Sequence, residues 1–236
     1  MVEVSTSILS MQQGDEAETI LKLEKSKTDY FHIDVMDGKF VEKNTFNKMR
    51  EYSEYIKRIS NLPLDVHLMV EDVETAISVF ETIQPNIITF HLEACKDENE
   101  VIQTIKRIRE SNIKVGIAVK PNTKIEEVYK YVPYVHMVLV MTVEPGKGGQ
   151  TMITDMLEKI SKLKTYVEEN EYDIDIEADG GINLATAERV KKAGANILVS
   201  GTAILQAVDY KTIIYELKKW LRRIFKQMTT KDRYSY

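Results

Sequence analysis

Short runs rich in Val, Ile and Phe alternate with longer amphipathic stretches along the whole chain. The short runs have the length and composition of buried strands, which we expect at 3–9, 29–36, 64–69, 86–91, 113–118, 136–141, 174–179 and 196–200. Between them apolar residues recur at helical spacing, most clearly over 151–169. Eight strand–helix units in succession predict parallel strands closed into a single (β/α)₈ TIM barrel.

A doubly wound open sheet is the alternative fold for such an alternation. That fold usually has fewer strands and carries one Gly-rich phosphate turn after its first strand. Here the first strand ends in Ser7-Ile8-Leu9-Ser10, and the glycines cluster late in the chain. We therefore expect one barrel domain over 1–228, followed by a disordered tail over 229–236, which has no apolar period.

Composition and charge narrow the possible partners and the compartment. The net charge is −5 with no basic strand-loop platform, which argues against a nucleic-acid partner, and the basic run at 218–226 fits a solvated helix face. The single Cys95 excludes an internal disulfide and fits a reducing compartment. No signal peptide is visible and no apolar run approaches the roughly 20 residues needed to span a bilayer. We expect a cytoplasmic protein without a membrane partner.

Alternation with period two predicts which strand residues point into the barrel. In the second strand it separates an apolar face from a polar one, so that Asp34 points inward. On the second, third, fourth and sixth strands the inward set comprises His32, Asp34, Met36, His67, Met69, Thr89, His91, Glu93 and Met141. The seventh strand ends with the inward carboxylate of Asp179.

Two histidines and two aspartates therefore converge at the carboxyl ends of the strands, where barrel enzymes place their functional residues. Imidazole and carboxylate ligands together suit Zn²⁺ and related divalent ions. We predict a metal site at His32, Asp34, His67 and Asp179; the alternative is a purely structural polar cluster.

The two aspartates also fit an acid–base pair. A base on one face of a carbon and an acid on the other can invert it, while a metal stabilises the enediolate formed between the two steps. The three inward methionines either fill core space or line the site beside that intermediate.

Glycine-rich segments follow three adjacent strands: 144–150, Gly180-Gly181 and Gly201-Thr202. Glycines let backbone amides approach an anion, and barrel phosphate sites favour the loops after the last strands. We predict a phosphate site here, although tight turns would use the same residues. Lys147 either adds a charge to the anion or points to solvent.

Taken together, these residues resemble the ribulose-phosphate 3-epimerase family. The matching segments cover nearly the whole chain up to the last helix: Ser7-Ile8-Leu9-Ser10, His32-Ile33-Asp34-Val35-Met36-Asp37-Gly38, Asp65-Val66-His67-Leu68-Met69-Val70, Thr89-Phe90-His91-Leu92-Glu93-Ala94, Val140-Met141-Thr142-Val143-Glu144-Pro145-Gly146, Asp179-Gly180-Gly181-Ile182 and Val199-Ser200-Gly201-Thr202-Ala203-Ile204.

The resemblance implies a barrel that interconverts D-ribulose 5-phosphate and D-xylulose 5-phosphate in the pentose phosphate pathway by inverting C3. It implies one divalent metal per subunit, usually zinc, with iron, manganese or cobalt as substitutes, and a homo-oligomer, dimeric or hexameric. Asp34 and Asp179 would be both metal ligands and the acid–base pair. The expected substrate contacts are Ser7, Met36, His67, Met69, Met141, Gly146, Gly148, Gly149, Asp179, Gly180, Gly181, Gly201 and Thr202. Asp37 has outward parity and is expected to be structural, in a turn with Gly38.

Two departures from the family pattern border the expected substrate mouth. Lys147 stands where the family usually has a bulky aromatic residue, and 42–48 reads Glu-Lys-Asn-Thr-Phe-Asn-Lys in place of Pro-Asn-Xaa-Thr-Phe-Gly-Pro. These departures bear on the choice of sugar, so D-allulose 6-phosphate is the alternative substrate.

Two further hypotheses come from other functional classes. The first is a barrel that binds a sugar phosphate without catalysis. The second is a decarboxylase or lyase with Lys120 at the centre of its site, although Lys120-Pro121 more simply ends the fifth strand at the rim.

Overall fold

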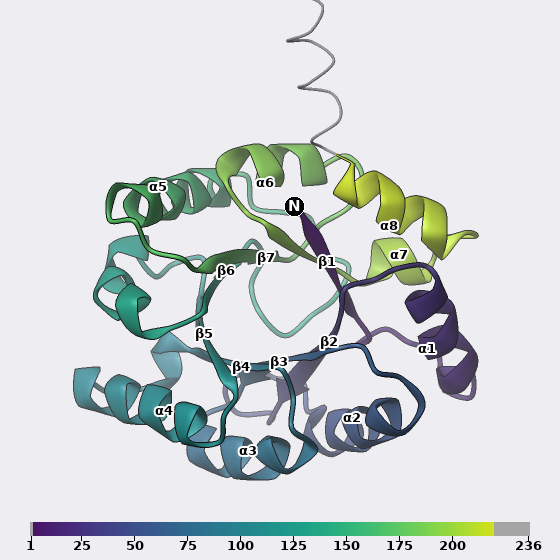
Figure 1. Cartoon of the computed structure of the whole chain (residues 1–236), viewed down its shortest axis with the longest axis horizontal. Helices are drawn as coiled ribbons and strands as arrows, with labels where there is room; N and C mark the ends of the chain where they lie inside the picture. The colour runs from purple at the N-terminus through teal and green to yellow at the C-terminus, as the bar shows by residue number, and fades with distance from the viewer. Residues whose placement is uncertain (1, 220–236) are drawn as a thin grey trace, which may run out of the picture.

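The computed structural model describes residues 2–219 and contains a closed barrel of eight parallel strands in sequence order. The first strand pairs with both the second and the eighth, which closes the ring and excludes the open-sheet alternative. Figure 1 shows this ring of strands seen through its opening, with the helices arranged around the outside. The strands are β1 (Glu3–Ser7), β2 (Tyr30–Met36), β3 (Leu64–Met69), β4 (Ile87–His91), β5 (Lys114–Val119), β6 (Met137–Met141), β7 (Asp175–Asp179) and β8 (Ile197–Ser200).

Helices cover the outer surface of the barrel. The α-helices are α1 (Glu16–Lys25), α2 (Phe46–Ile59), α3 (Val73–Phe80), α4 (Glu98–Glu110), α5 (Met156–Glu169), α6 (Ala187–Ala193), α7 (Thr202–Leu205) and α8 (Tyr210–Lys218). Short 3₁₀ helices are η1 (Glu81–Ile83), η2 (Leu92–Ala94), η3 (Ile125–Glu127) and η4 (Tyr129–Tyr134). Between β5 and β6 the connection consists of η3 and η4, and Pro133 lies inside η4. Within residues 2–219, no helix has the length and apolar character to cross a bilayer.

All eight predicted strands are present, and two predicted boundaries are wrong by more than one residue. The strand expected over 3–9 ends at Ser7, because the chain turns there and the Met11 amide donates to the Ile8 carbonyl. The helix expected over 151–169 begins only at Met156. Before it, the Ile153 amide donates to the Thr142 carbonyl at 2.8 Å, which ties this segment to the end of β6. The predicted tail at 229–236 and the predicted domain end at 228 lie outside the described residues.

The two faces of the strands differ as the alternation predicts. Outward residues such as Phe31, Ile33 and Val35 are fully buried in the core between the barrel and its helices. The barrel interior is apolar at the side chains Ile87, Ala118, Met137, Leu139, Met141 and Ile197. Elsewhere it is polar, with the buried side chains Ser5, Ser7, His32, Asp34, Asp65, His67, Thr89, His91 and Glu177. Burying so many polar groups is unfavourable unless they are paired or bind a ligand, so this part of the interior is the candidate site.

Candidate metal centre and active site

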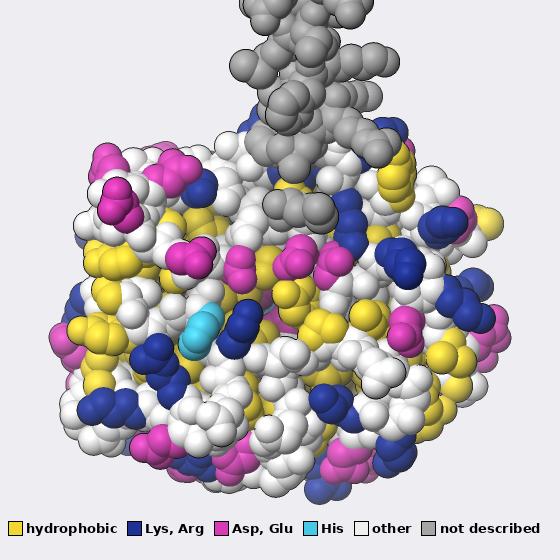
Figure 2. Space-filling model, viewed as in Figure 1, with side chains coloured by type: hydrophobic (Ala, Val, Ile, Leu, Met, Phe, Trp, Pro, Cys, Tyr) yellow, Lys and Arg dark blue, Asp and Glu magenta, His cyan; other side chains and the backbone are white. Residues whose placement is uncertain are grey.

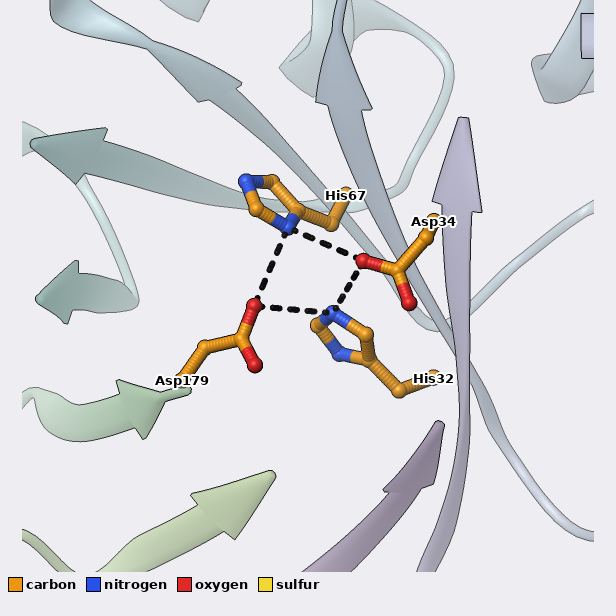
Figure 3. A group of neighbouring side chains, drawn as sticks. All are labelled: His32, Asp34, His67 and Asp179. Atoms are coloured by element: carbon orange, nitrogen blue, oxygen red, sulfur yellow. Dashed lines mark ion pairs between the residues drawn. The ribbon is translucent and has the colours of Figure 1, made fainter. Parts of the chain in front are cut away.

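Strand register brings the four predicted metal ligands together. Asp34 on β2 lies directly opposite His67 on β3, and His32 lies one inward position below Asp34. Asp179 ends β7. Both histidines are fully buried, and the Asp179 side chain is the most exposed of the four at 15%. Figure 3 shows the four side chains pointing toward a common centre.

The distances around this centre are nearly equal. Asp34 Oδ1 lies 3.5 Å from His32 Nε2 and 3.6 Å from His67 Nδ1. Asp179 Oδ2 lies 3.8 Å and 3.6 Å from the same two nitrogens. Both nitrogens are buried without a hydrogen-bond partner among the described residues. For tetrahedral zinc with bonds of about 2.0–2.1 Å, neighbouring ligand atoms lie roughly 3.3 Å apart, so this donor set fits a divalent metal ion.

The far side of the His32 ring is held by a second buried carboxylate. His32 Nδ1 lies 2.6 Å from Asp65 Oδ2, which also accepts a 2.8 Å hydrogen bond from the Ser5 hydroxyl. This contact favours a proton on Nδ1 and leaves the Nε2 lone pair facing the centre when the ring is neutral. Without a metal, burial lowers the pKa of His32, but the charges of Asp65 and Asp34 outweigh burial and raise it well above the usual value.

Glu177 lies one inward position below Asp179 and is also fully buried. Burial raises its pKa well above the usual range, and the nearby charge of Asp65 adds to this, so the carboxyl is neutral. Together with His32 and Asp65 it forms a second acidic group that could coordinate a cation. The 2.6 Å contact between His32 Nδ1 and Asp65 is a hydrogen bond, too short for two ligands of one ion. This lower group therefore supports the centre above it.

The two aspartates have opposite electrostatic environments. At Asp34 burial raises the pKa, but the nearby positive charge of His32 outweighs it and keeps the pKa well below the usual range. At Asp179 burial raises the pKa to about 6; His32 opposes this rise, and the charge of Asp34 adds to it. The Ser7 hydroxyl donates to Asp34 Oδ2 at 2.7 Å, which orients that carboxylate. Two carboxyl groups with separated pKa values suit general acid–base chemistry.

Two threonines fix the backbone of the aspartates. The Thr45 hydroxyl donates to the Asp34 carbonyl at 2.6 Å and accepts the Met36 amide at 3.0 Å. The Thr142 hydroxyl donates to the Asp179 carbonyl at 2.9 Å. Sequence reasoning missed both, because they lie in loops where alternation carries no signal. It also missed the roles of Asp65 and Glu177, although both have inward parity.

A cavity of about 250 Å³ opens above the two aspartates. Predicted substrate contacts that line it are Ser7, Met36, Met69, Met141, Gly146, Gly148, Gly149, Asp179, Gly180, Gly181, Gly201 and Thr202. His67, also predicted to contact the substrate, is not among the lining residues and lies fully buried beneath the cavity. The structure therefore places it as a candidate metal ligand and not as a residue of the cavity wall.

The three glycine-rich loops meet at one end of this cavity. A Cβ atom added at Gly148 or Gly149 would lie 3.8 Å from Thr202 Oγ1, so the loops after β6 and β8 face each other closely. Gly181 has φ +65, and a Cβ atom there would approach the Met152 amide nitrogen to 2.5 Å. No other residue fits that position without moving the chain. The backbones of the loops after β6, β7 and β8 therefore surround one end of the cavity.

The two lysines considered as site residues lie away from the metal centre. Lys147 lines the cavity rim but is 74% exposed, and its Nζ atom lies 3.8 Å from Glu42 Oε2. The two departures from the family pattern thus contact each other at the surface. Lys120 follows the end of β5, and its Nζ atom lies 3.6 Å above the Phe40 ring and not in the cavity. This placement removes the basis for a lysine-centred lyase.

Asp37 is structural, as its outward parity predicts. Its carboxylate accepts hydrogen bonds from the backbone amides of Lys39, Phe40 and Glu71 at 2.8–2.9 Å. Burial opposes ionisation, but these amides keep the pKa of Asp37 below its usual value. Asp37 therefore fixes the turn after β2 against the end of β3.

Comparison with known proteins gives one consistent result. The model of the Ribulose-phosphate 3 epimerase family matches residues 3–205. A ribulose-phosphate 3-epimerase from Methanocaldococcus jannaschii is 41% identical over 219 residues, 93% of this chain and 91% of its own. The Bacillus subtilis protein of that name is 38% identical, covering 92% and 99%. The chloroplastic ribulose-5-phosphate-3-epimerase of Arabidopsis thaliana is 34% identical, covering 91% and 75%.

Solved structures with little sequence similarity share the fold. A 3-hexulose-6-phosphate synthase aligns with a TM-score of 0.67 at 17% identity, over 92% of this chain and 98% of its own. The KGPDC protein of Streptococcus mutans aligns with a TM-score of 0.66 at 11% identity, over 95% and 100%. At these identities the likeness establishes the barrel fold alone.

Proposed function

Because this chain belongs to the ribulose-phosphate 3-epimerase family and is an isomerase, we propose that it interconverts D-ribulose 5-phosphate and D-xylulose 5-phosphate by inverting C3. The observation that carries this proposal is the placement of Asp34 and Asp179 at the floor of one cavity, on β2 and β7, with separated pKa values. Inversion needs a base and an acid on opposite faces of one carbon, and Asp34 and Asp179 are the two carboxyl groups that barrel strands contribute to the cavity lining.

Each aspartate can hold a metal and move a proton at the same time. Asp34 Oδ1 and Asp179 Oδ2 face the centre, which leaves the second oxygen of each carboxyl group for proton transfer. Asp34 takes the C3 proton from one face of the sugar, and Asp179 returns a proton to the other face. The reverse reaction exchanges the two roles.

We propose that His32, Asp34, His67 and Asp179 hold one divalent ion, with zinc the best match to two imidazoles and two carboxylates. When bound, such an ion supplies positive charge beside the substrate oxygens that become negative during proton removal. The methionine side chains Met36, Met69 and Met141 form an apolar wall that excludes water from the same region.

The glycine-rich loops hold the phosphate in this proposal. Gly148, Gly149, Gly181 and Gly201 lie where backbone amides can reach an anion without obstruction by side chains, and Thr202 adds a hydroxyl group. Ser7 lies between the two ends of the cavity and fixes Asp34. The substrate would therefore be anchored at its phosphate and presented to the aspartates at C3.

The reaction can be tested by solvent isotope incorporation. Zinc-loaded protein incubated with D-ribulose 5-phosphate in D₂O should place deuterium at C3 of both epimers; failure to do so would overturn the proposal. Asp179→Asn should reduce kcat by roughly 10²–10⁴-fold, the usual effect of removing a general acid or base. A protein that only binds sugar phosphates would show no turnover to lose, which separates that alternative.

The choice of sugar depends on the mouth, where Lys147 and Glu42 replace the family residues. We propose the pentose as substrate, and D-allulose 6-phosphate remains the alternative. A comparison of kcat/KM for the two sugars with defined zinc loading decides between them, and a preference for the hexose would overturn the named substrate. Lys147→Phe restores the family residue and should change the ratio of the two kcat/KM values, with little effect on kcat.

A cytoplasmic location, a role in the pentose phosphate pathway and a homo-oligomeric state remain proposals that follow from the family. Charged side chains of both signs are interspersed over the face drawn in Figure 2.

A further inference from the structure

The two candidate metal-ligand histidines are supported in different ways on their far sides. His32 contacts the carboxylate of Asp65 directly. His67 instead contacts another imidazole, since its Nε2 atom lies 2.9 Å from Nε2 of His91. The two ring centroids are 5.0 Å apart, a separation expected for imidazoles joined end to end through their nitrogens. His91 is fully buried on β4, so water does not compete for this contact.

His91 contacts a third group on its other side. Its Nδ1 atom lies 3.1 Å from Glu93 Oε2 in η2. Its ring is fully buried beside His67, where a second positive charge next to a metal ion would be unfavourable, so the neutral form is favoured. A neutral imidazole carries one N–H donor and one acceptor nitrogen. Its two partners therefore require one donated and one accepted hydrogen bond.

The hydrogen bonds from His67 through His91 to Glu93 can run in only one direction, which the last group decides. Glu93, with a pKa lowered to about 2, is ionised and can only accept, so His91 must donate from Nδ1. His91 Nε2 is then the acceptor, and His67 must donate from its own Nε2. That tautomer of His67 leaves a lone pair on Nδ1, the nitrogen that faces Asp34 and Asp179.

Glu93 is itself held in place by the loop after β5. Its Oε1 atom accepts the Lys120 amide at 2.7 Å and the Thr123 hydroxyl, which leaves Oε2 for His91. The ammonium group of Lys159 on α5 fixes this loop by donating to the carbonyls of Lys120, Pro121 and Thr123 at 2.6–2.9 Å. Glu93, the last group in this hydrogen-bonded series, is therefore held in a fixed orientation.

We propose that Glu93 and His91 are positioning residues that fix the tautomer and orientation of His67, so that its Nδ1 lone pair points into the metal centre. This inference rests on the proposed metal site and extends it to two residues that touch neither metal nor substrate. Outer partners of metal-bound histidines typically change metal affinity by about 10–100-fold when removed.

Variants give the first test. His91→Phe keeps a ring but removes the acceptor for His67, and should weaken zinc binding by about 10–100-fold in a chelator competition. Glu93→Gln replaces an obligate acceptor with a group that can also donate, and should weaken binding by less. Two controls should bind zinc as wild type does. His136→Phe removes an imidazole that accepts a hydrogen bond from the Val115 amide, and Glu81→Gln alters a carboxylate of similar exposure to Glu93 (25% against 21%) beside Arg107.

A direct readout does not depend on how the variants fold. Nitrogen NMR of isotope-labelled histidine in the zinc-loaded full chain should show His91 protonated on Nδ1 only and His67 protonated on Nε2 only. Protonation of His91 on Nε2 would overturn the inference, as would wild-type zinc affinity in a folded His91→Phe protein. If the wild-type chain fails to bind zinc at all, the proposed metal site fails and this inference fails with it; normal zinc binding with reversed tautomers overturns the inference alone.

Discussion

At the scale of single residues, a metal ion and protons compete for the same ligand atoms of His32 and Asp179. His32 is protonated at neutral pH in the metal-free protein, because Asp65 and Asp34 raise its pKa well above the usual value against the effect of burial. Asp179 has a pKa of about 6, mainly through burial. Metal binding requires the His32 lone pair and an ionised Asp179, so each group must be deprotonated as the ion enters.

This competition predicts proton release on zinc binding. At about pH 7 the ion should displace a proton from His32, since Asp179 is already mostly ionised; near pH 5 the number should be larger by about one, because Asp179 is then mostly protonated. The affinity should therefore fall more steeply with acidification below the pKa of Asp179 than above it. Isothermal titration calorimetry in buffers of different ionisation enthalpy measures the number released. A binding enthalpy independent of the buffer at about pH 7 would contradict this assignment.

Sequence alternation predicted the inward aspartates and histidines, because the side-chain period of a strand does not depend on its neighbours. The roles of Asp65 and Glu93 could not be predicted in this way. Asp65 meets His32 because β2 and β3 pair in one particular register, and Glu93 is oriented by a loop that follows another strand. Alignment between strands is a tertiary property, and the separated pKa values of the two aspartates depend on it.

At the scale of elements, α5 fixes the loop that orients Glu93. Lys159 is only 9% exposed, and its ammonium group donates to three backbone carbonyls of the β5–η3 loop. A lysine in an amphipathic helix is normally solvent-exposed, so the sequence alone gives no sign of this role. The helix itself was predictable from its apolar period; its start was not, because the Ile153 hydrogen bond to Thr142 decides where helical structure begins.

Lys159→Met should lower the free energy of unfolding by about 1.5–3 kcal/mol, the usual cost of losing hydrogen bonds to a charged group and leaving buried carbonyls unpaired. Lys162→Met is a matched control in the same helix, because Lys162 is 52% exposed and pairs only with Glu158. It should change stability by no more than about 0.5 kcal/mol. Urea denaturation of the metal-free proteins measures both, and equal effects would show that the contacts of Lys159 contribute nothing beyond helix propensity.

At the scale of the whole molecule, the metal centre joins strands that are far apart in the sequence. Its candidate ligands come from β2, β3 and β7, so an ion would link the first and last parts of the closed ring. An ion that binds only the folded chain adds its binding free energy to the stability of the entire barrel.

Zinc at about 100 times its dissociation constant should stabilise the protein by about 2.7 kcal/mol. For a chain of this length that corresponds to a rise in Tm of roughly 5–10 °C. Differential scanning calorimetry with zinc and with a chelator measures the difference. A His32→Ala/His67→Ala double variant should show no such difference, and an equal Tm of the wild-type protein in both conditions would argue against a metal shared by these strands.

The barrel interior contains both apolar and polar side chains, and this difference decides how easily each residue can be replaced. Leu139 packs in an apolar cluster with Ala118, Met141 and Val143, so replacement by a residue of similar volume should cost less than about 1.5 kcal/mol. On the polar side, removal of Asp65 would strand the Ser5 hydroxyl and one nitrogen of His32, so no single apolar replacement leaves its neighbours satisfied. The apolar residues of the interior can therefore be exchanged one at a time, while the hydrogen-bonded polar ones can change only as a group.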